Sequence, residues 1–261
     1  MMKSATAKFL LLLLLCAFIP FALFGQDRIT DEDEAREIFE EVEDRRSSIS
    51  TETATMSMTI TDSRGRTRER TMKTWNLNEG DNSSSLIVFT DPGNVSGTAF
   101  LTIREDGNSS QKLYLPSIGR VQTITAGERG DRFMGSDFTF EDLGDQQAED
   151  YEFEWLETQE EVYRVRANKP ESEQYAFVEF FIDRDRYTLN EIHYFNSDGE
   201  MIKRLEATDF DKINDQLWSP GKMTMYDLRE DRQTEITWSD REINASIPGW
   251  RFTERGLRRG A

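Results

Sequence analysis

The sequence predicts a mainly β protein with helices (α+β class), built on a large curved antiparallel sheet or barrel. Apolar and polar residues alternate with a period of two along most of the chain, which is the pattern of strands with one buried face. The alternating segments amount to about nine to eleven strands, a number typical of large sheets and barrels. One clear helical pattern stands near the N-terminus.

The helical pattern covers residues 30–47. Thr30 or Asp31 can cap its start, and acidic residues fill its first turns, where the helix dipole favours negative charge. We therefore expect an amphipathic helix with one packed face and with its other faces in water. The apolar stripe on the packed face consists of Ile38, Phe39 and Val42.

The strand predictions follow the alternation along the chain. The first strand places Met56, Met58 and Ile60 on one face, and a turn at Gly65 leads into a charged return strand over residues 67–76. Residues 191–202 read as a hairpin, because Asn196-Ser-Asp-Gly199 supplies turn residues between two alternating runs. Further strands are predicted at residues 151–155, 177–182, 217–228 and 233–240.

The middle of the chain, residues 91–145, interrupts the alternation. It is rich in glycine and contains two of the six prolines, so we expect irregular structure, with further helices as an option. Long irregular segments in a compact domain are usually lids or binding loops. Its last part carries much apolar bulk, in Phe133, Met134, Phe138, Phe140 and Leu143.

Charge and composition exclude several classes of function. The chain has 50 acidic and 32 basic residues and a net charge of −18, which argues against nucleic acid as a partner and against a polybasic grip on anionic lipid. One cysteine and one histidine rule out an internal disulfide, Cys-rich zinc sites and His-based triads. We expect no cofactor and no metal.

Residues 1–25 have the form of a cleaved signal peptide. Lys3 and Lys8 flank the start of an apolar run that Pro20 breaks, and the run is short for a membrane span. Lipid anchoring at Cys16 is the less favoured alternative, because Leu residues stand where a small residue is expected before a lipidated cysteine. A second alternative is that residues 1–25 stay on the protein as an uncleaved N-terminal anchor. Residues 26–261 show no long linker or repeat, so we expect a single domain there.

Three segments carry a resemblance to a known family. They are Gly97-Thr-Ala-Phe-Leu-Thr-Ile103, Tyr114-Leu-Pro-Ser-Ile-Gly-Arg120 and Phe133-Met-Gly-Ser-Asp-Phe-Thr-Phe-Glu-Asp-Leu143. Together they resemble the LolA-like family of outer-membrane lipoprotein-sorting proteins, and the similarity extends from the helix at residue 30 to residues 252–255.

The resemblance implies an unclosed antiparallel β-barrel covered by helices, with an apolar cavity for acyl chains between sheet and helices. It also implies a periplasmic carrier of lipoproteins or lipids towards the outer membrane. Its partners would be an inner-membrane transporter or an RND-type exporter, and an outer-membrane acceptor. Neither the cargo nor the transporter is fixed by the sequence.

We expect the acyl cavity or its lid to be lined by soft apolar side chains, since methionine and phenylalanine adapt to flexible chains. Plain core packing is the alternative for each of them. The predicted ligand-binding residues are Met56, Met58, Ile60, Met72, Phe100, Leu113, Leu115, Phe133, Met134, Phe138, Phe140 and Leu143; Met223 and Met225 are further methionine candidates.

Residues 132–143 are the predicted lid. They are interpreted either as a hinged element with Gly130 and Gly135 as pivots, or as a structural plug that never moves. The carboxylates of Asp137, Glu141 and Asp142 are interpreted as a solvated face or helix caps rather than as acid/base groups.

Three other functions compete with the carrier. An accessory lipid-binding protein of an RND-type exporter would share the fold and differ in cargo and partner. A ligand-free envelope scaffold would fill the barrel with its own side chains. An enzyme would need paired carboxylates that nothing identifies, and no Gly-X-Ser-X-Gly elbow is present, so we predict no catalysis.

Overall fold

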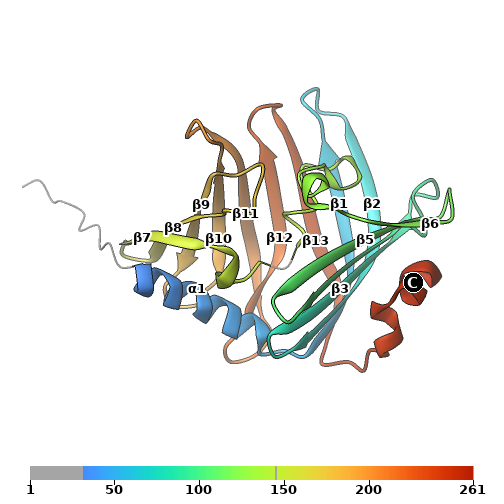
Figure 1. The fold of residues 1–261 in the computed structure, drawn as a ribbon, viewed down its shortest axis with the longest axis horizontal. Helices are drawn as coiled ribbons and strands as arrows, with labels where there is room; N and C mark the ends of the chain where they lie inside the picture. The colour runs from blue at the N-terminus through green and yellow to red at the C-terminus, as the bar shows by residue number, and fades with distance from the viewer. Residues whose placement is uncertain (1–31, 145, 261) are drawn as a thin grey trace, which may run out of the picture.

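A single antiparallel sheet dominates the computed structural model (Figure 1), which describes residues 32–260 except residue 145. The predicted signal peptide at residues 1–25 lies outside the described residues. In sheet order, the thirteen strands are β6 (Arg120–Thr123), β5 (Asn108–Leu115), β4 (Ala99–Glu105), β3 (Asn82–Asp91), β2 (Thr67–Glu79), β1 (Thr51–Thr61), β13 (Arg232–Ile243), β12 (Trp218–Asp227), β11 (Met201–Lys212), β10 (Leu189–Phe195), β9 (Phe177–Asp183), β8 (Val162–Asn168) and β7 (Glu152–Thr158).

The order of the strands explains why the barrel is unclosed and why its inside is covered. Every strand pairs with its neighbours in the sequence, except that β6 does not pair with β7. In addition, the first and last strands, β1 and β13, pair with each other. Strands β6 and β7 are consecutive in the chain but form the two opposite edges of the sheet. Residues 124–151, here named the crossing segment, must therefore span the curved sheet from one edge to the other.

Two expectations about strands were wrong. The sheet has thirteen strands rather than nine to eleven, and residues 91–145 contain the regular strands β4, β5 and β6. Several of the glycines that suggested irregular structure lie in the tight connections beside these strands. Gly97, Gly107 and Gly119 all have positive φ angles, which glycine adopts without steric cost. Only the crossing segment is irregular as expected.

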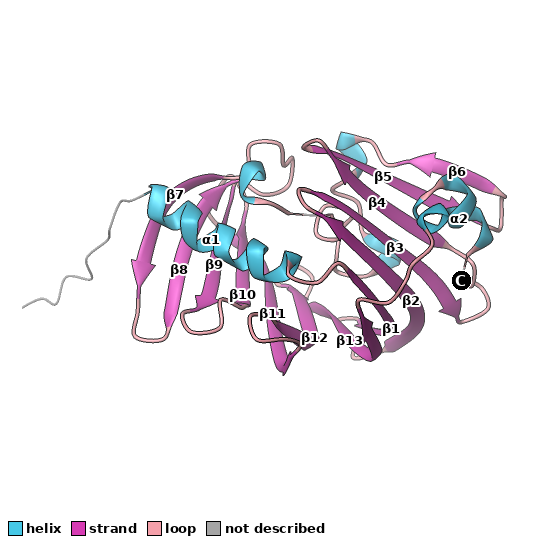
Figure 2. Cartoon of the chain, turned by 90° about the horizontal axis from the view of Figure 1, so that it is seen from below, coloured by secondary structure: helices cyan, strands magenta, loops and turns pink. Residues whose placement is uncertain are grey.

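The predicted N-terminal helix is confirmed as α1 (Glu32–Ser47). Its buried stripe faces the inner side of the sheet, and the Phe39 ring lies 4.8 Å from that of Phe180 on β9 and 5.6 Å from that of Phe153 on β7. At the C-terminal end, the Arg45 guanidinium lies 4.3 Å from the Tyr187 ring in the β9–β10 turn. Helix α1 thus covers the β7 end of the inner face (Figure 2).

The C-terminal residues cover the outer face at the opposite end of the sheet. The short helices η4 (Gly249–Phe252) and α2 (Glu254–Arg259) bury Phe252 and Leu257 against a second apolar cluster on β2, β3 and β4. A side chain at Gly256 is impossible, because a Cβ atom there would lie 2.0 Å from the carbonyl oxygen of Arg251. The predicted covering of the open barrel by helices therefore holds for α1, whereas α2 lies outside the barrel.

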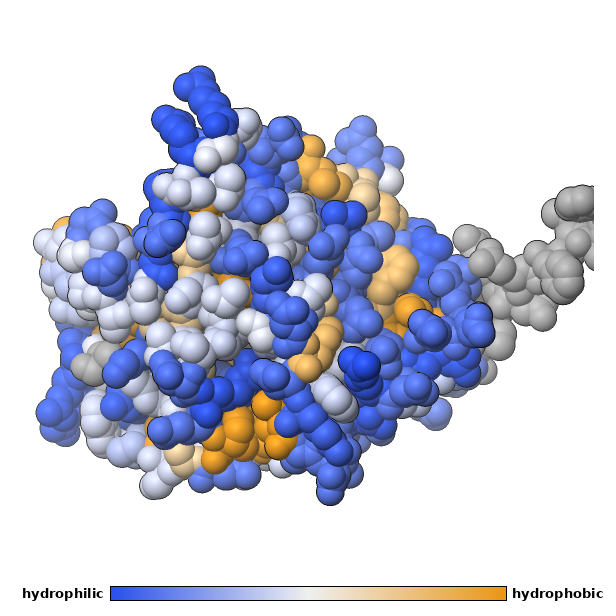
Figure 3. Space-filling model, turned by 180° about the vertical axis from the view of Figure 1, so that it is seen from behind, coloured by the Kyte–Doolittle hydropathy of each residue, from blue (hydrophilic) through white to orange (hydrophobic). Residues whose placement is uncertain are grey.

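One face of the molecule is largely polar. The face drawn in Figure 3 is mostly hydrophilic and carries scattered apolar patches, the largest of them near its lower edge. Within the described part of the chain, no helix has the length and apolar character needed to cross a membrane.

Candidate functional site

The predicted ligand-binding residues gather in one apolar cluster on the inner face. Met56 on β1 stands opposite Met72 on β2, and Phe100 on β4 stands opposite Leu113 on β5. Nine of the twelve are buried in this cluster, and Leu115, Met134 and Leu143 are partly buried against it. These side chains therefore share one apolar surface, and whether they contact a ligand stays a prediction.

Phenylalanines of the crossing segment form the roof of this cluster. Phe133 is fully buried, and its ring centre lies 5.2 Å from that of Phe100 and 5.7 Å from those of Phe89 and Phe140. Phe89 on β3 was missed, because the run Leu86-Ile-Val-Phe89 is apolar at every position. Its alternation is therefore hidden, although a strand buried on both faces is what such a run indicates.

Methionines form the floor between the two halves of the sheet. Met56, Met58, Met72 and Met225 are buried, and Met223 on β12 is partly buried against the same cluster. Their unbranched thioether chains adapt to irregular apolar partners. This part of the inner face can therefore reshape around a flexible chain more easily than a face of β-branched residues.

The predicted lid is a tight loop within the crossing segment, which also contains the short 3₁₀ helices η1 (Ala126–Glu128), η2 (Phe133–Gly135) and η3 (Ala148–Asp150). The amide of Phe133 donates to the carbonyl of Phe138, and the amide of Phe140 donates to that of Asp131. The predicted pivots differ in role. Gly135 has a φ angle of +77°, which favours glycine. Gly130 does not have a positive φ angle; a side chain there would crowd Gln174, which lies 3.1 Å from the position of a Cβ atom.

A first group of buried charges fixes this loop to the sheet. Thr234 on β13 donates a hydrogen bond of 2.6 Å to the Asp137 carboxylate and accepts one from the Asp137 amide at 2.9 Å. The guanidinium of Arg232 lies 3.1 Å from the same carboxylate. Arg132 in turn pairs with Asp227 on β12 at 2.6 Å. The loop is therefore held by charge as well as by apolar packing.

A second buried group lies one strand further along the sheet. The ammonium group of Lys203 on β11 lies 3.2 Å from the Asp142 carboxylate, and their side chains are only 2 % and 1 % exposed. The Tyr175 hydroxyl donates to Asp142 at 2.9 Å and accepts from Lys203 at 3.0 Å. Asp142 also accepts from the Thr139 amide at 2.8 Å, so its carboxylate is fully engaged.

The expectation that the three carboxylates of this region form a solvated face or helix caps was wrong; the residues at the N-caps of the short helices here are Thr125, Arg132 and Gln147. Asp137 and Glu141 are buried, and so is the side chain of Asp142. Glu141 pairs with Lys169 at 3.0 Å and accepts a hydrogen bond from Ser172 at 3.0 Å. Each acid meets a cation or a hydroxyl of a distant element, which no local sequence pattern reveals. All three hold the crossing segment in place.

Three buried tyrosines surround the second charged group. Burial raises the pKa of Tyr151, Tyr175 and Tyr194 well above the ordinary value, and the nearby negative charge of Asp142 adds to the effect at Tyr175 and Tyr194. The folded protein therefore keeps three phenol protons that the unfolded chain loses above a pH of about 10.

We expect the stability of the protein to be unaffected by these tyrosines below that pH and to fall above it, by about 1.4 kcal/mol per pH unit for each group. Urea denaturation over the alkaline range measures the slope. Tyr194→Phe removes one titrating group and should make the slope shallower; an unchanged slope would show that Tyr194 does not contribute.

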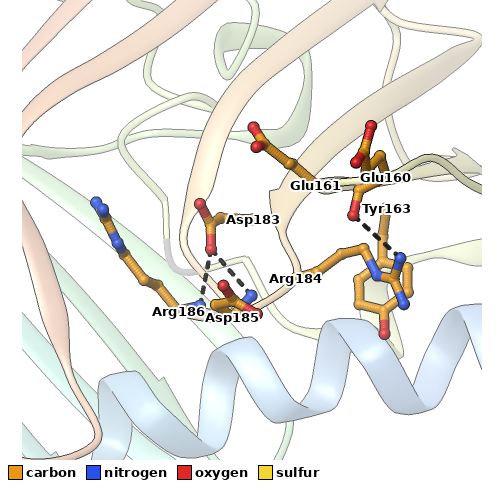
Figure 4. A pocket seen from close by; sticks show the side chains of 7 residues that line it. All are labelled: Glu160, Glu161, Tyr163, Asp183, Arg184, Asp185 and Arg186. Carbon is orange, nitrogen blue, oxygen red and sulfur yellow. Dashed lines mark hydrogen bonds between the residues drawn. The ribbon is translucent and has the colours of Figure 1, made fainter.

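Two surface hollows are lined mainly by charged side chains, although Phe153 of the apolar cluster lines one of them and Tyr163, which packs against the cluster, lines the other. One, of about 450 Å³, is formed by the β7–β8 and β9–β10 turns and is lined by Glu160, Glu161, Tyr163, Asp183, Arg184, Asp185 and Arg186 (Figure 4). The other, of about 580 Å³, lies between α1 and β7 and includes Glu32, Asp33 and Glu154. Charged linings of this kind do not suit an acyl chain, and Arg184 is already bound to the carbonyl of Glu160.

The single histidine of the chain has structural partners. His193 lies on the outer face, with its ring 4.6 Å from that of Phe181 and hydrogen-bonded to Glu191. Among the described residues, no group of three or more His, Cys, Asp or Glu side chains is arranged to hold a metal ion.

Known proteins share this architecture. A protein-family model described as "Uncharacterized protein" matches residues 81–259. A search of the curated proteins found no match. Among solved structures, a domain described as an outer membrane lipoprotein-sorting protein from Vibrio parahaemolyticus is similar with a TM-score of 0.82 and 26 % identity, over 87 % of this chain and 100 % of that one.

Two further structures extend the similarity. A DUF1329 family protein from Desulfovibrio piger has a TM-score of 0.81 and 21 % identity, over 87 % of this chain and 98 % of its own. A LolA superfamily protein from Nitrosomonas europaea has a TM-score of 0.66 and 16 % identity, over 85 % and 98 % of the two chains. At these identities the two show the same fold.

Proposed function

The chain belongs to the family whose model matches residues 81–259 and is a LolA-like protein, and from this premise we propose that it carries acyl chains of lipoproteins or lipids through the periplasm. The observation that supports the proposal most is the apolar cluster between the inner face and the crossing segment. It joins Met56, Met72, Phe100 and Leu113 of the sheet to Phe133 of the roof.

The energetics of such a cluster suit transfer. Burial of one methylene is worth about 0.8 kcal/mol, so a sixteen-carbon chain gains about 12 kcal/mol against water. Against a second apolar environment the same chain gains almost nothing. A cluster of soft side chains therefore protects the chain from water and still releases it to a membrane.

Cargo enters by displacing part of the crossing segment. The thirteen strands are paired without any contribution from the predicted lid at residues 132–143, so moving it leaves the sheet hydrogen bonds intact. The ion pairs of Arg132 and Lys203 hold the closed form. An acyl chain that takes the place of the roof phenylalanines packs on the same apolar side chains of the sheet, which offsets the cost of opening.

The partners follow from the same proposal. We propose an inner-membrane transporter or an RND-type exporter as donor and an outer-membrane component as acceptor. A net charge of −18 favours basic docking surfaces on both and keeps the carrier off anionic lipid. The proposal includes no catalysis, since Asp137, Glu141 and Asp142 are committed to structural partners.

Lipid extraction and mass spectrometry of protein purified from a periplasm test the proposal. We expect a co-purified lipid or acylated peptide, and the intact mass from the same sample reports whether the chain starts after residue 25 or at a lipidated Cys16. Protein that is empty, and that stays empty when offered acyl probes, favours the scaffold. That second candidate is supported by the close packing of the cluster on itself.

A substitution on the methionine floor tests the location of the cargo. Met223 is partly buried against the cluster and stands opposite Ile236. We expect Met223→Gln to weaken the binding of a fluorescent fatty-acid probe about tenfold, because a polar amide against an acyl chain loses its hydrogen bonds to water. Met201→Gln is the matched control, since Met201 is exposed at the start of β11; equal losses in both variants would place the probe elsewhere.

A further inference from the structure

The inner face of β4 and β5 changes from apolar to polar along the strands, which lie side by side at one end of the sheet (Figure 2). Inner-facing residues recur at every second position. From the centre of the face towards the β4–β5 turn, the successive cross-strand pairs are Phe100–Leu113, Thr102–Gln111 and Arg104–Ser109. This order matches the parts of an amphiphile: the first pair suits the apolar tail, the second the polar linkage group and the third the head group.

The middle pair contains two unsatisfied polar atoms. Thr102 and Gln111 are each 3 % exposed. Among the described residues, neither the Thr102 hydroxyl oxygen nor the side-chain carbonyl oxygen of Gln111 has a hydrogen-bond partner. Buried polar groups are costly when unpaired, and a specific unpaired group in a folded protein calls for an explanation. Two such atoms on directly opposed residues point to a polar group supplied by a ligand.

The neighbouring contacts define what that group must be. The side-chain nitrogen of Gln111 donates to the Phe140 carbonyl at 2.8 Å, and this bond identifies the remaining atom as the acceptor oxygen. The Thr102 hydroxyl is able to donate. The Cβ atoms of directly opposed residues are about 5 Å apart. The Gln111 oxygen can therefore accept from the N–H of a ligand amide while the Thr102 hydroxyl donates to the C=O of the same amide.

The pair is within reach of the outside. Ser85 on β3 is the cross-strand partner of Thr102 and is only half-buried, so the inner face opens to solvent one strand away. Beyond this pair, the buried Arg104 is paired with Asp150 at 3.0 Å and with Glu149 at 3.5 Å. Because its charge is already balanced, the site selects the linkage group rather than an anionic head.

We propose that Thr102 and Gln111 bind the amide of an N-acylated ligand whose acyl chain lies on Phe100 and Leu113. Thr102 donates to the amide carbonyl and Gln111 accepts from the amide N–H. An ester offers the carbonyl alone and leaves the Gln111 oxygen unpaired. The inference rests on the proposed carrier function and narrows its cargo to amide-linked acyl chains.

Competition between two probes tests it. In this assay, N-methylpalmitamide and methyl palmitate compete separately with a fluorescent fatty acid for the delipidated full-length protein, and the displacement gives the affinity of each probe. We expect the amide to bind about tenfold more tightly, as one additional hydrogen bond allows. Gln111→Met should abolish this preference, and Thr102→Val should weaken both probes by a similar factor, because both contain a carbonyl.

Thr74→Val is the matched control. Thr74 is buried to the same degree on the same face, but its hydroxyl already donates to the Ala54 carbonyl, so this variant should leave the affinity of both probes and the amide preference unchanged. Equal affinity for the two probes, or a preference that survives Gln111→Met, overturns the amide site while the carrier function stands. If neither probe displaces the fatty acid because none of them binds, the carrier function itself fails.

Discussion

Lys203→Met is expected to lower the free energy of unfolding by about 3–5 kcal/mol, because it removes one partner of a buried ion pair and leaves the other charge uncompensated. Lys203 and Asp142 are almost fully buried and 3.2 Å apart. The Tyr175 hydroxyl also loses the hydrogen bond that it accepts from the ammonium group. Urea denaturation monitored by tryptophan fluorescence measures the change.

Two further variants isolate the cause. The double variant Lys203→Met/Asp142→Leu removes both charges of the pair, so we expect it to recover a large part of the stability that Lys203→Met alone loses. Lys212→Met is the control, since Lys212 pairs with the fully exposed Asp215, and exposed pairs are worth about 0–1 kcal/mol. If Lys203→Met and Lys212→Met cost the same, the buried pair does not hold the crossing segment.

Phe133→Ala is expected to cost about 3–5 kcal/mol, the range for removing a buried aromatic side chain. Phe133 is fully buried, and its ring packs on Phe89, Phe100 and Phe140. The variant leaves a cavity between the roof and the sheet. Thermal and urea unfolding both report the loss.

The same variant distinguishes a packed roof from a loose flap. Ile118→Ala is the control, because Ile118 is 64 % exposed and should change stability by less than about 0.5 kcal/mol. A loss at Phe133 as small as that of the control would mean that the crossing segment contributes little to the closed form, contrary to the ion pairs and ring contacts described above.

Local patterns predicted the elements whose signals are local. The helix at residues 32–47 follows from its acidic start and its apolar stripe, and the hairpin of β10 and β11 follows from the Asn196–Gly199 turn. The predicted caps, Thr30 and Asp31, lie outside the described residues. Strands β4 to β6 were hidden because their glycine turns dominate the composition of that stretch. The short C-terminal helix α2 has too few turns to show a period.

In the candidate site, the apolar residues were predictable from the sequence and the charge pairs were not. Apolar residues such as Met56 and Phe133 are recognisable as buried from their type and spacing, and they do share one cluster. The partners of Asp137 and Asp142 are separated from them by 97 and 61 residues. Such pairings depend on the path of the crossing segment, which follows from the strand order and from no local feature of the sequence.

Photoaffinity labelling is the most direct measurement of the central claim, that acyl chains lie on the inner face beneath the crossing segment. A palmitoyl probe with a photoreactive group near the end of its chain is bound to the delipidated protein, irradiated and mapped by peptide mass spectrometry. The account predicts adducts on the peptides of β1, β2, β4 and β5 that carry Met56, Met72, Phe100 and Leu113, and their loss when unlabelled palmitate is in excess. Adducts confined to outer-face peptides, or an absence of competable adducts, would contradict it.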